Sequence, residues 1–135
     1  MIIFISILSI ACLVFNDRID MKITNKRNGI LIAGKAKVVK SLFSQLRGLI
    51  GYRSFDSDSA LILPGCRQIH TFFMRFSIDI IFIDRNNRVI HIFESASPNK
   101  VSGYVPDSAA AIEISGGISS GKIEVGDVLL IDNEV

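Results

Sequence analysis

The chain has 135 residues, of which 49% are hydrophobic and 21% are charged, and its formal net charge at pH 7 is +2. This length suits one domain with its own hydrophobic core rather than the several domains of a large enzyme. Two cysteines, Cys12 and Cys66, are too few for a disulfide framework. Because no run of Lys or Arg exceeds two residues, we expect no nucleic-acid binding.

An apolar run begins at Met1 and ends at Phe15, interrupted only by serines. It is short for a membrane span, which needs about 20 residues, and it lacks the positive charge that opens a secretory signal. Two interpretations stay open: an export signal or weak membrane anchor, or a translation start at Met21. We expect an apolar segment over residues 1–20 and one β-rich domain over residues 21–135. The protein is cytoplasmic if translation starts at Met21, and otherwise exported or membrane-associated, with membrane contact through the apolar run.

Most of the domain has the pattern of short strands separated by turns. One hairpin is expected around Ala33-Gly34, and another around the DRNN turn at residues 84–87. The segments with strand character are residues 22–24, 60–63, 70–76, 78–83, 88–93, 110–115 and 128–131.

One segment has a helical period instead. Four apolar residues between Leu42 and Ile50 recur at helical spacing, Ser41 is a suitable N-cap, and Gly51 is a stop. Because only this segment has such a period, a parallel βαβ architecture is disfavoured. The predicted fold class is therefore mainly β (α+β), a small antiparallel barrel-like sheet with one short helix over about residues 42–50.

The segment GCRQIHTFFMRF holds most of the residues that could carry chemistry. Cys66, His70 and Met74 are spaced four apart, and these soft ligands would suit copper. On a strand, however, residues four apart lie about 13 Å from one another, which one ion cannot bridge. We therefore expect no metal site and no cofactor.

A nucleophilic site would pair Cys66 with His70 and an acid such as Asp79 or Asp84. The three catalytic candidates are thus Cys66, His70 and Asp79. No nucleophile elbow or thiol-protease signature surrounds the cysteine, and a lone cysteine after Pro-Gly is more often a small buried side chain. The sequence leaves enzymatic activity open but favours its absence.

The alternation of side chains favours a binding surface. If residues 70–82 are extended, the even-numbered positions are apolar apart from His70 and face the core, with the imidazole at the rim. Arg75 and Asp79 fall on the odd positions, where their charges are costly unless they are paired or wet. We therefore expect a polar ligand-binding cleft around Arg47, His70, Arg75 and Asp79.

The segment LRGLIGYRSFDSDSALILPGCRQIHTFFMRFSIDIIFID, with the later IEIS and VGD motifs, resembles the pattern of the domain of unknown function 192 family. This family is also called uncharacterised protein family 0127. The shared marks run in order from about residue 30 to residue 131. The motif residues carried here are Arg47, Gly48, Cys66, His70, Thr71, Met74, Arg75 and Asp79.

The resemblance implies a small barrel-like β domain with a short helix and no established reaction. Ser77 stands where the family usually has proline, and some relatives replace the FFMRF motif with Trp-Met-Lys-Asn. We expect a ligand-binding or accessory interaction module without its own catalysis, acting on an unidentified small molecule or protein. The alternatives are a hydrolase or metal-dependent enzyme centred on Cys66 and His70, and a structural partner in the cell envelope.

Overall fold

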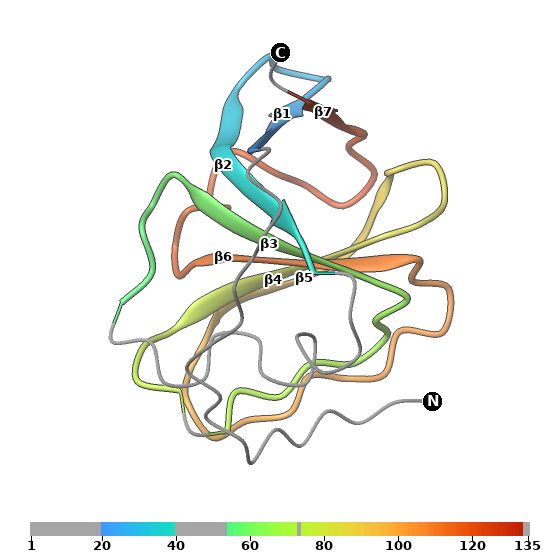
Figure 1. The fold of residues 1–135 in the computed structure, drawn as a ribbon. Coiled ribbons are helices and arrows are strands. Elements are labelled where there is room, and N and C mark those ends of the chain that lie inside the picture. Colours follow the sequence, from blue (N-terminus) through green and yellow to red (C-terminus); the bar gives the residue numbers. More distant parts are fainter. Residues whose placement is uncertain (1–19, 40–53, 73, 134–135) are drawn as a thin grey trace.

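The computed structural model describes residues 20–39, 54–72 and 74–133. In this part, the chain forms one seven-stranded sheet of order β5-β4-β6-β3-β2-β1-β7 (Figure 1). All neighbouring strands are antiparallel except β2 and β3, which are parallel. The strands are β1 (Met21–Asn25), β2 (Leu31–Val38), β3 (Ser59–Pro64), β4 (Ile78–Ile83), β5 (Val89–Ala96), β6 (Ala110–Ser115) and β7 (Leu129–Asn133).

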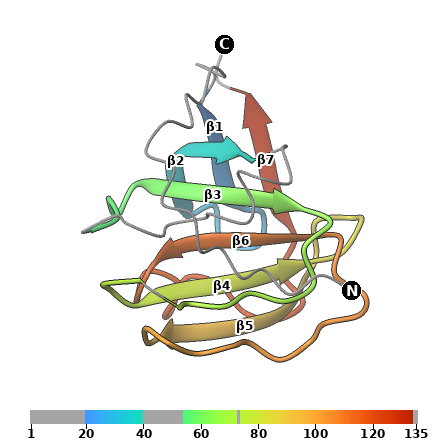
Figure 2. The same cartoon turned by 60° about the horizontal axis from the view of Figure 1, so that its bottom comes forward.

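The sheet curls into a half-barrel, so the prediction of a mainly β, barrel-like fold is confirmed (Figure 2). The two edge strands approach at one end, where an isolated bridge joins Arg88 to Val128. The N–H of Val89 also donates to the carbonyl of Asp127 over 2.7 Å. The predicted helix over residues 42–50 lies outside the described residues.

Each face of the sheet carries its own hydrophobic core. Alternate residues of β6 point to opposite sides, with Ile112 and Ile114 in one cluster and Ala111 in the other. The first cluster also receives β1, β2 and β7, and it fills the inside of the curl. The second cluster, which we call the outer core, is covered by the loop that carries Cys66 and Met74. Strand β4 therefore has all six residues buried.

The predicted hairpin at Ala33-Gly34 is wrong, because Leu31–Val38 is one continuous strand. Gly34 makes a close contact with a neighbouring loop and does not form a turn. Its N–H donates to the Asp58 carboxylate over 2.8 Å, and a Cβ at this position would lie 2.9 Å from the same carboxylate. Glycine therefore lets the loop before β3 approach β2.

The predicted strand over residues 70–76 is also wrong. His70 forms only an isolated bridge with Val101, and the N–H of Met74 donates to the Thr71 carbonyl over 3.2 Å, which closes a turn. The expected alternation fails as well, because Thr71, on the other parity from His70, is buried. The second hairpin, formed by β4 and β5 around residues 84–87, is confirmed.

The apolar run over residues 1–15 lies outside the described residues. Within the part of the chain that the structure describes, no helix is long and apolar enough to cross a membrane.

Candidate functional site

Two loops, residues 65–77 and residues 97–108, lie together over the outer core, and Thr71 joins them. Its hydroxyl donates to the Ser97 carbonyl over 2.6 Å and accepts from the Lys100 N–H over 2.9 Å. Its own N–H donates to the Lys100 carbonyl, and its carbonyl accepts from the Asn99 N–H. These four hydrogen bonds hold the two loops together as a cover over the outer core.

Cys66 is fully buried beneath this cover. Its thiol donates to the Gln68 carbonyl over 3.2 Å, and its carbonyl accepts from the Ser108 hydroxyl over 2.8 Å. Burial raises the pKa of the Cys66 thiol to about 12, and the nearby carboxylate of Glu113 acts in the same direction. The sulfur is therefore a neutral thiol at neutral pH, which is the form that does not attack substrates.

Glu113 lies in the middle of the outer core. It pairs directly with Leu61 on one side and with Ile80 on the other, and Ile80 in turn pairs with Phe93. Directly paired residues share a face of the sheet, so these side chains form one row. Glu113 is 3% exposed, and its Oε2 has no hydrogen-bond partner among the described residues. Burial raises the pKa of the Glu113 carboxyl to about 7.

His70 is buried at the edge of the same cover. Its ring stacks on Phe72 with centroids 5.4 Å apart, and its Nδ1 accepts from the Phe72 N–H over 3.3 Å. Burial lowers the pKa of His70, which favours the neutral imidazole. The bridge to Val101 makes His70 a link between the two loops.

Asp79 is fully buried and faces the other side of the sheet from Ile78 and Ile80. One carboxylate oxygen accepts from the N–H groups of Ser95 and Gly117, and the other accepts from the N–H and hydroxyl of Ser119. All four bonds are between 2.6 and 2.9 Å long. The structure therefore separates Asp79 from Cys66 and uses it to hold β5 and the loop after β6.

The remaining predicted residues either have separate environments, as Arg75 and Asp84 do, or lie outside the described residues. Arg75 is exposed, and no ion pair between described residues connects it to Asp79. Asp84 shapes the hairpin turn, where it accepts from the N–H groups of Asn86 and Arg88. Arg47 lies outside the described residues. Over residues 20–39, 54–72 and 74–133, no group of three His, Cys, Asp or Glu side chains could hold a metal ion.

A pocket of about 420 Å³ opens beside β5, and we call it the β5 pocket. Its floor is apolar, with Ile80 and Phe93 of the outer core, whereas its rim is polar and includes the exposed residues Glu94 and Lys100. This size falls in the range of small-molecule sites. The pocket is lined by Thr71, Ile80, Ile92, Phe93, Glu94, Ser95, Ala96, Ser97, Lys100, Val101 and Ser102.

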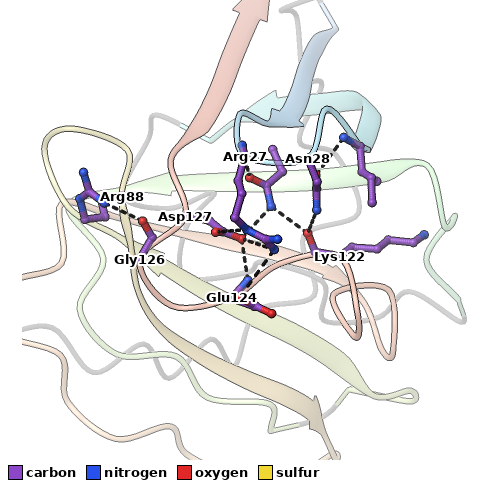
Figure 3. Close-up of polar contacts among 9 residues, drawn as sticks. Arg27, Asn28, Arg88, Lys122, Glu124, Gly126 and Asp127 are labelled. Carbon is purple, nitrogen blue, oxygen red and sulfur yellow. Dashed lines mark hydrogen bonds and ion pairs between the residues drawn. The ribbon is translucent and has the colours of Figure 1, made fainter.

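A second polar cluster lies at the turn before β7 (Figure 3). Arg27 donates to Asp127 through Nε over 2.6 Å, and the Asn25 amide donates to the same carboxylate over 2.7 Å. The hydrogen bond from Arg27 is the main reason that the pKa of Asp127 is lowered to about 2. Asn25 ends β1 and Arg27 lies in the turn that follows, so this ionised carboxylate ties the two ends of the domain together. We interpret the cluster as structural.

Glu113 and the charged rim of the β5 pocket were not predicted as site residues. A signal for Glu113 exists in the sequence, because it is the only charge in the apolar strand AAIEIS. Alternation alone would place it on a solvent face, opposite Ile112 and Ile114. Only the cover over the outer core, formed by distant loops, turns that position into a buried one.

Two known proteins resemble most of this chain in sequence. A UPF0127 protein from Thermococcus sibiricus is 33% identical over 110 residues, which cover 76% of this chain and 70% of the relative. A UPF0127 protein from Thermococcus kodakarensis is 29% identical over 114 residues, covering 79% of this chain and 71% of the relative.

Two solved structures share the fold, each with a TM-score of 0.70. A protein of unknown function from Novosphingobium aromaticivorans is 20% identical and covers 82% of each chain. A Sinorhizobium meliloti protein whose name suggests transcription regulation is 16% identical and covers 84% of this chain and 92% of the other. At these identities the likeness shows the fold alone. The family model of DUF192, an uncharacterized ACR, matches residues 23–131, and the chain therefore belongs to the DUF192 family.

Proposed function

We propose that this domain is a non-catalytic binding module that holds its ligand in the β5 pocket. The observation that carries the proposal is the combination of an apolar floor with two charged groups on the rim. Among the described residues, neither the Glu94 carboxylate nor the Lys100 ammonium has a hydrogen bond or ion pair. A few placed polar groups above an apolar floor are typical of ligand sites.

Two of the predicted site residues support the pocket from behind. Asp79 accepts from the Ser95 N–H, and Ser95 lines the pocket. His70 pairs with Val101, which lines the opposite wall. We therefore assign both residues a positioning role in the module. The buried Cys66 thiol, with its raised pKa, argues against the rival in which it attacks a substrate.

Mutation of the pocket wall tests the binding role. Val101 is 47% exposed, so a Val101→Trp variant should fold normally while its indole fills the β5 pocket. We expect ligands from a small-fragment library to shift the backbone amide signals of residues 92–102 in the wild-type protein. Val101→Trp should weaken this binding by about tenfold or more, because the ligand loses its contact with the floor.

The matched control is Val125→Trp, since Val125 is 63% exposed and lies outside the pocket. This variant should bind fragments as the wild type does. Fragments that bind Val101→Trp equally well, or whose shifts lie away from residues 92–102, would remove the β5 pocket as the binding site.

The thiol gives a separate test of the enzymatic rival. In a Cys12→Ser background, Cys66 should react with a thiol reagent at neutral pH roughly 100-fold more slowly than it does in denaturant, because attack needs local unfolding. A cysteine at exposed Ser120, in a Cys12→Ser, Cys66→Ala background, provides the fast reference. If Cys66 reacted as fast as this reference, the non-catalytic proposal would fail.

A further inference from the structure

Strand β5 has an open outer edge beside the pocket. It is the terminal strand of the sheet, with β4 as its strand partner. Bonds to the segment before β7 involve only Val89, the first residue of the strand, and Arg88 just before it. From Ile90 onward, the described part of the chain offers no strand to pair with this edge. An open edge presents a row of backbone donors and acceptors.

The connection after β5 turns back and runs along this edge without pairing to it (Figure 2). Its backbone bonds go elsewhere: Lys100 and Ser102 bond to Thr71 and Ile69 in the neighbouring loop. The β5 pocket lies between the two segments, because residues 92–97 form one wall and residues 100–102 form the other. The pocket is thus a slot along a strand edge.

The chemistry of the slot fits an extended backbone with charged ends. Apart from the Ser95 N–H, which bonds to Asp79, and the Ser97 carbonyl, which bonds to Thr71, the strand edge supplies backbone groups that match a peptide. Ile80 and Phe93 supply a floor for an apolar side chain. Glu94 and Lys100 add one negative and one positive group to the same rim. These opposite charges complement a ligand that carries both an ammonium and a carboxylate.

We propose that the β5 pocket binds a short peptide with free ends, which adds a strand to the open edge of β5. This inference rests on the binding role proposed above and names its ligand class. The terminal ammonium faces Glu94, the terminal carboxylate faces Lys100, and a central apolar side chain occupies the floor. Main-chain bonds to β5 provide affinity, whereas the two charges select peptides short enough to span the slot.

The probe is the tripeptide Ala-Leu-Ala, titrated into the full-length isotopically labelled protein. We expect saturable shifts at residues 92–102, and about fivefold weaker binding when the amino end is acetylated or the carboxyl end is amidated. Lys100→Ala should abolish the preference for the free carboxylate but keep the preference for the free ammonium. Glu94→Ala should do the reverse, and Lys122→Ala, remote from the pocket, should change neither.

Methylation of the central peptide nitrogen tests the strand pairing itself. It removes one backbone donor and should weaken binding about tenfold. Free leucine that binds as tightly as the tripeptide, or a methylated peptide that binds equally well, would overturn the edge-pairing inference. If library fragments bind and Val101→Trp weakens their binding, but the tripeptide does not bind, the peptide inference falls and the binding role stands. If neither binds, both fall.

Discussion

A Glu113→Gln variant is expected to lose most of the decline in stability that the wild-type protein shows as the pH rises from about 4.5 to 7. Below this window, the Glu113 carboxyl is neutral in both the folded and the unfolded chain. Inside it, the unfolded chain ionises while the folded chain keeps its proton, because burial raises the folded pKa from 4.5 to about 7. The unfolded state then binds fewer protons, so the free energy of unfolding falls with pH.

The size of the effect follows from the width of the window. Each pH unit between the two pKa values removes about 1.4 kcal/mol, so the Glu113 contribution amounts to roughly 3 kcal/mol. Urea denaturation at several pH values across the window measures it. Glutamine brings its own cost of buried donors next to Leu61 and Ile80, but this cost does not change with pH.

The control is Glu94→Gln, because Glu94 is exposed and its replacement should leave the pH profile of the wild type in place. If Glu113→Gln and the wild type declined in parallel through the window, the carboxyl would not be the proton-carrying group of the outer core.

The second large effect is expected for Asp79→Ala. The substitution removes the acceptor of four hydrogen bonds at once and leaves three N–H groups and one hydroxyl without a partner. Since buried donors without partners are costly, we expect a loss of roughly 4 kcal/mol in the free energy of unfolding. Chemical denaturation monitored by circular dichroism measures this loss.

Two variants separate this interpretation from a general loss of charge. Asp107→Ala removes an exposed carboxylate, for which we expect a change within about 0.5 kcal/mol. Asp79→Asn keeps one acceptor oxygen and should retain part of the stability. An Asp79→Ala protein as stable as Asp107→Ala would show that the carboxylate does not hold β5 to the loop after β6.

The hairpin of β4 and β5 was predictable because its information is local. A continuous apolar run, a polar four-residue turn and a returning strand define it within twenty residues of sequence. Asn87, with a φ of 60°, lies in that turn, where asparagine tolerates a left-handed backbone. The strand that contains Glu113 was equally clear from its β-branched residues.

The loop with Cys66 and His70 was not predictable for the opposite reason. Thr71 forms hydrogen bonds to Ser97 and Lys100, which lie 26 and 29 positions away in the sequence. No local sequence pattern predicts those bonds. They bind Thr71 to the neighbouring loop, and the Met74 N–H closes a turn on the Thr71 carbonyl despite the aromatic, strand-like composition of this segment. The prediction of a hairpin at Gly34 failed for the same reason. The Gly34 N–H donates to the Asp58 carboxylate, and Asp58 lies in a loop 24 positions away in the sequence.

The candidate site shows the same contrast between features that local sequence predicts and features that depend on distant contacts. Residue type alone points to Cys66, His70 and Asp79, whereas their environments depend on burial that only the folded chain defines. Asp79 differs from a catalytic acid because four donors already occupy its oxygens. The rim charges Glu94 and Lys100 look ordinary in sequence, and only the return of the chain along β5 places both on one pocket.

Strand β1 pairs with β2 on one side and with β7 on the other, and residues Met21 to Asn25 match Asn133 to Leu129 in register. During synthesis, β1 therefore leaves the ribosome about a hundred residues before its second neighbour exists. A nascent or truncated chain that ends before Leu129 must carry an uncovered β1 edge. A chain that stops before β7 is therefore prone to associate through that edge.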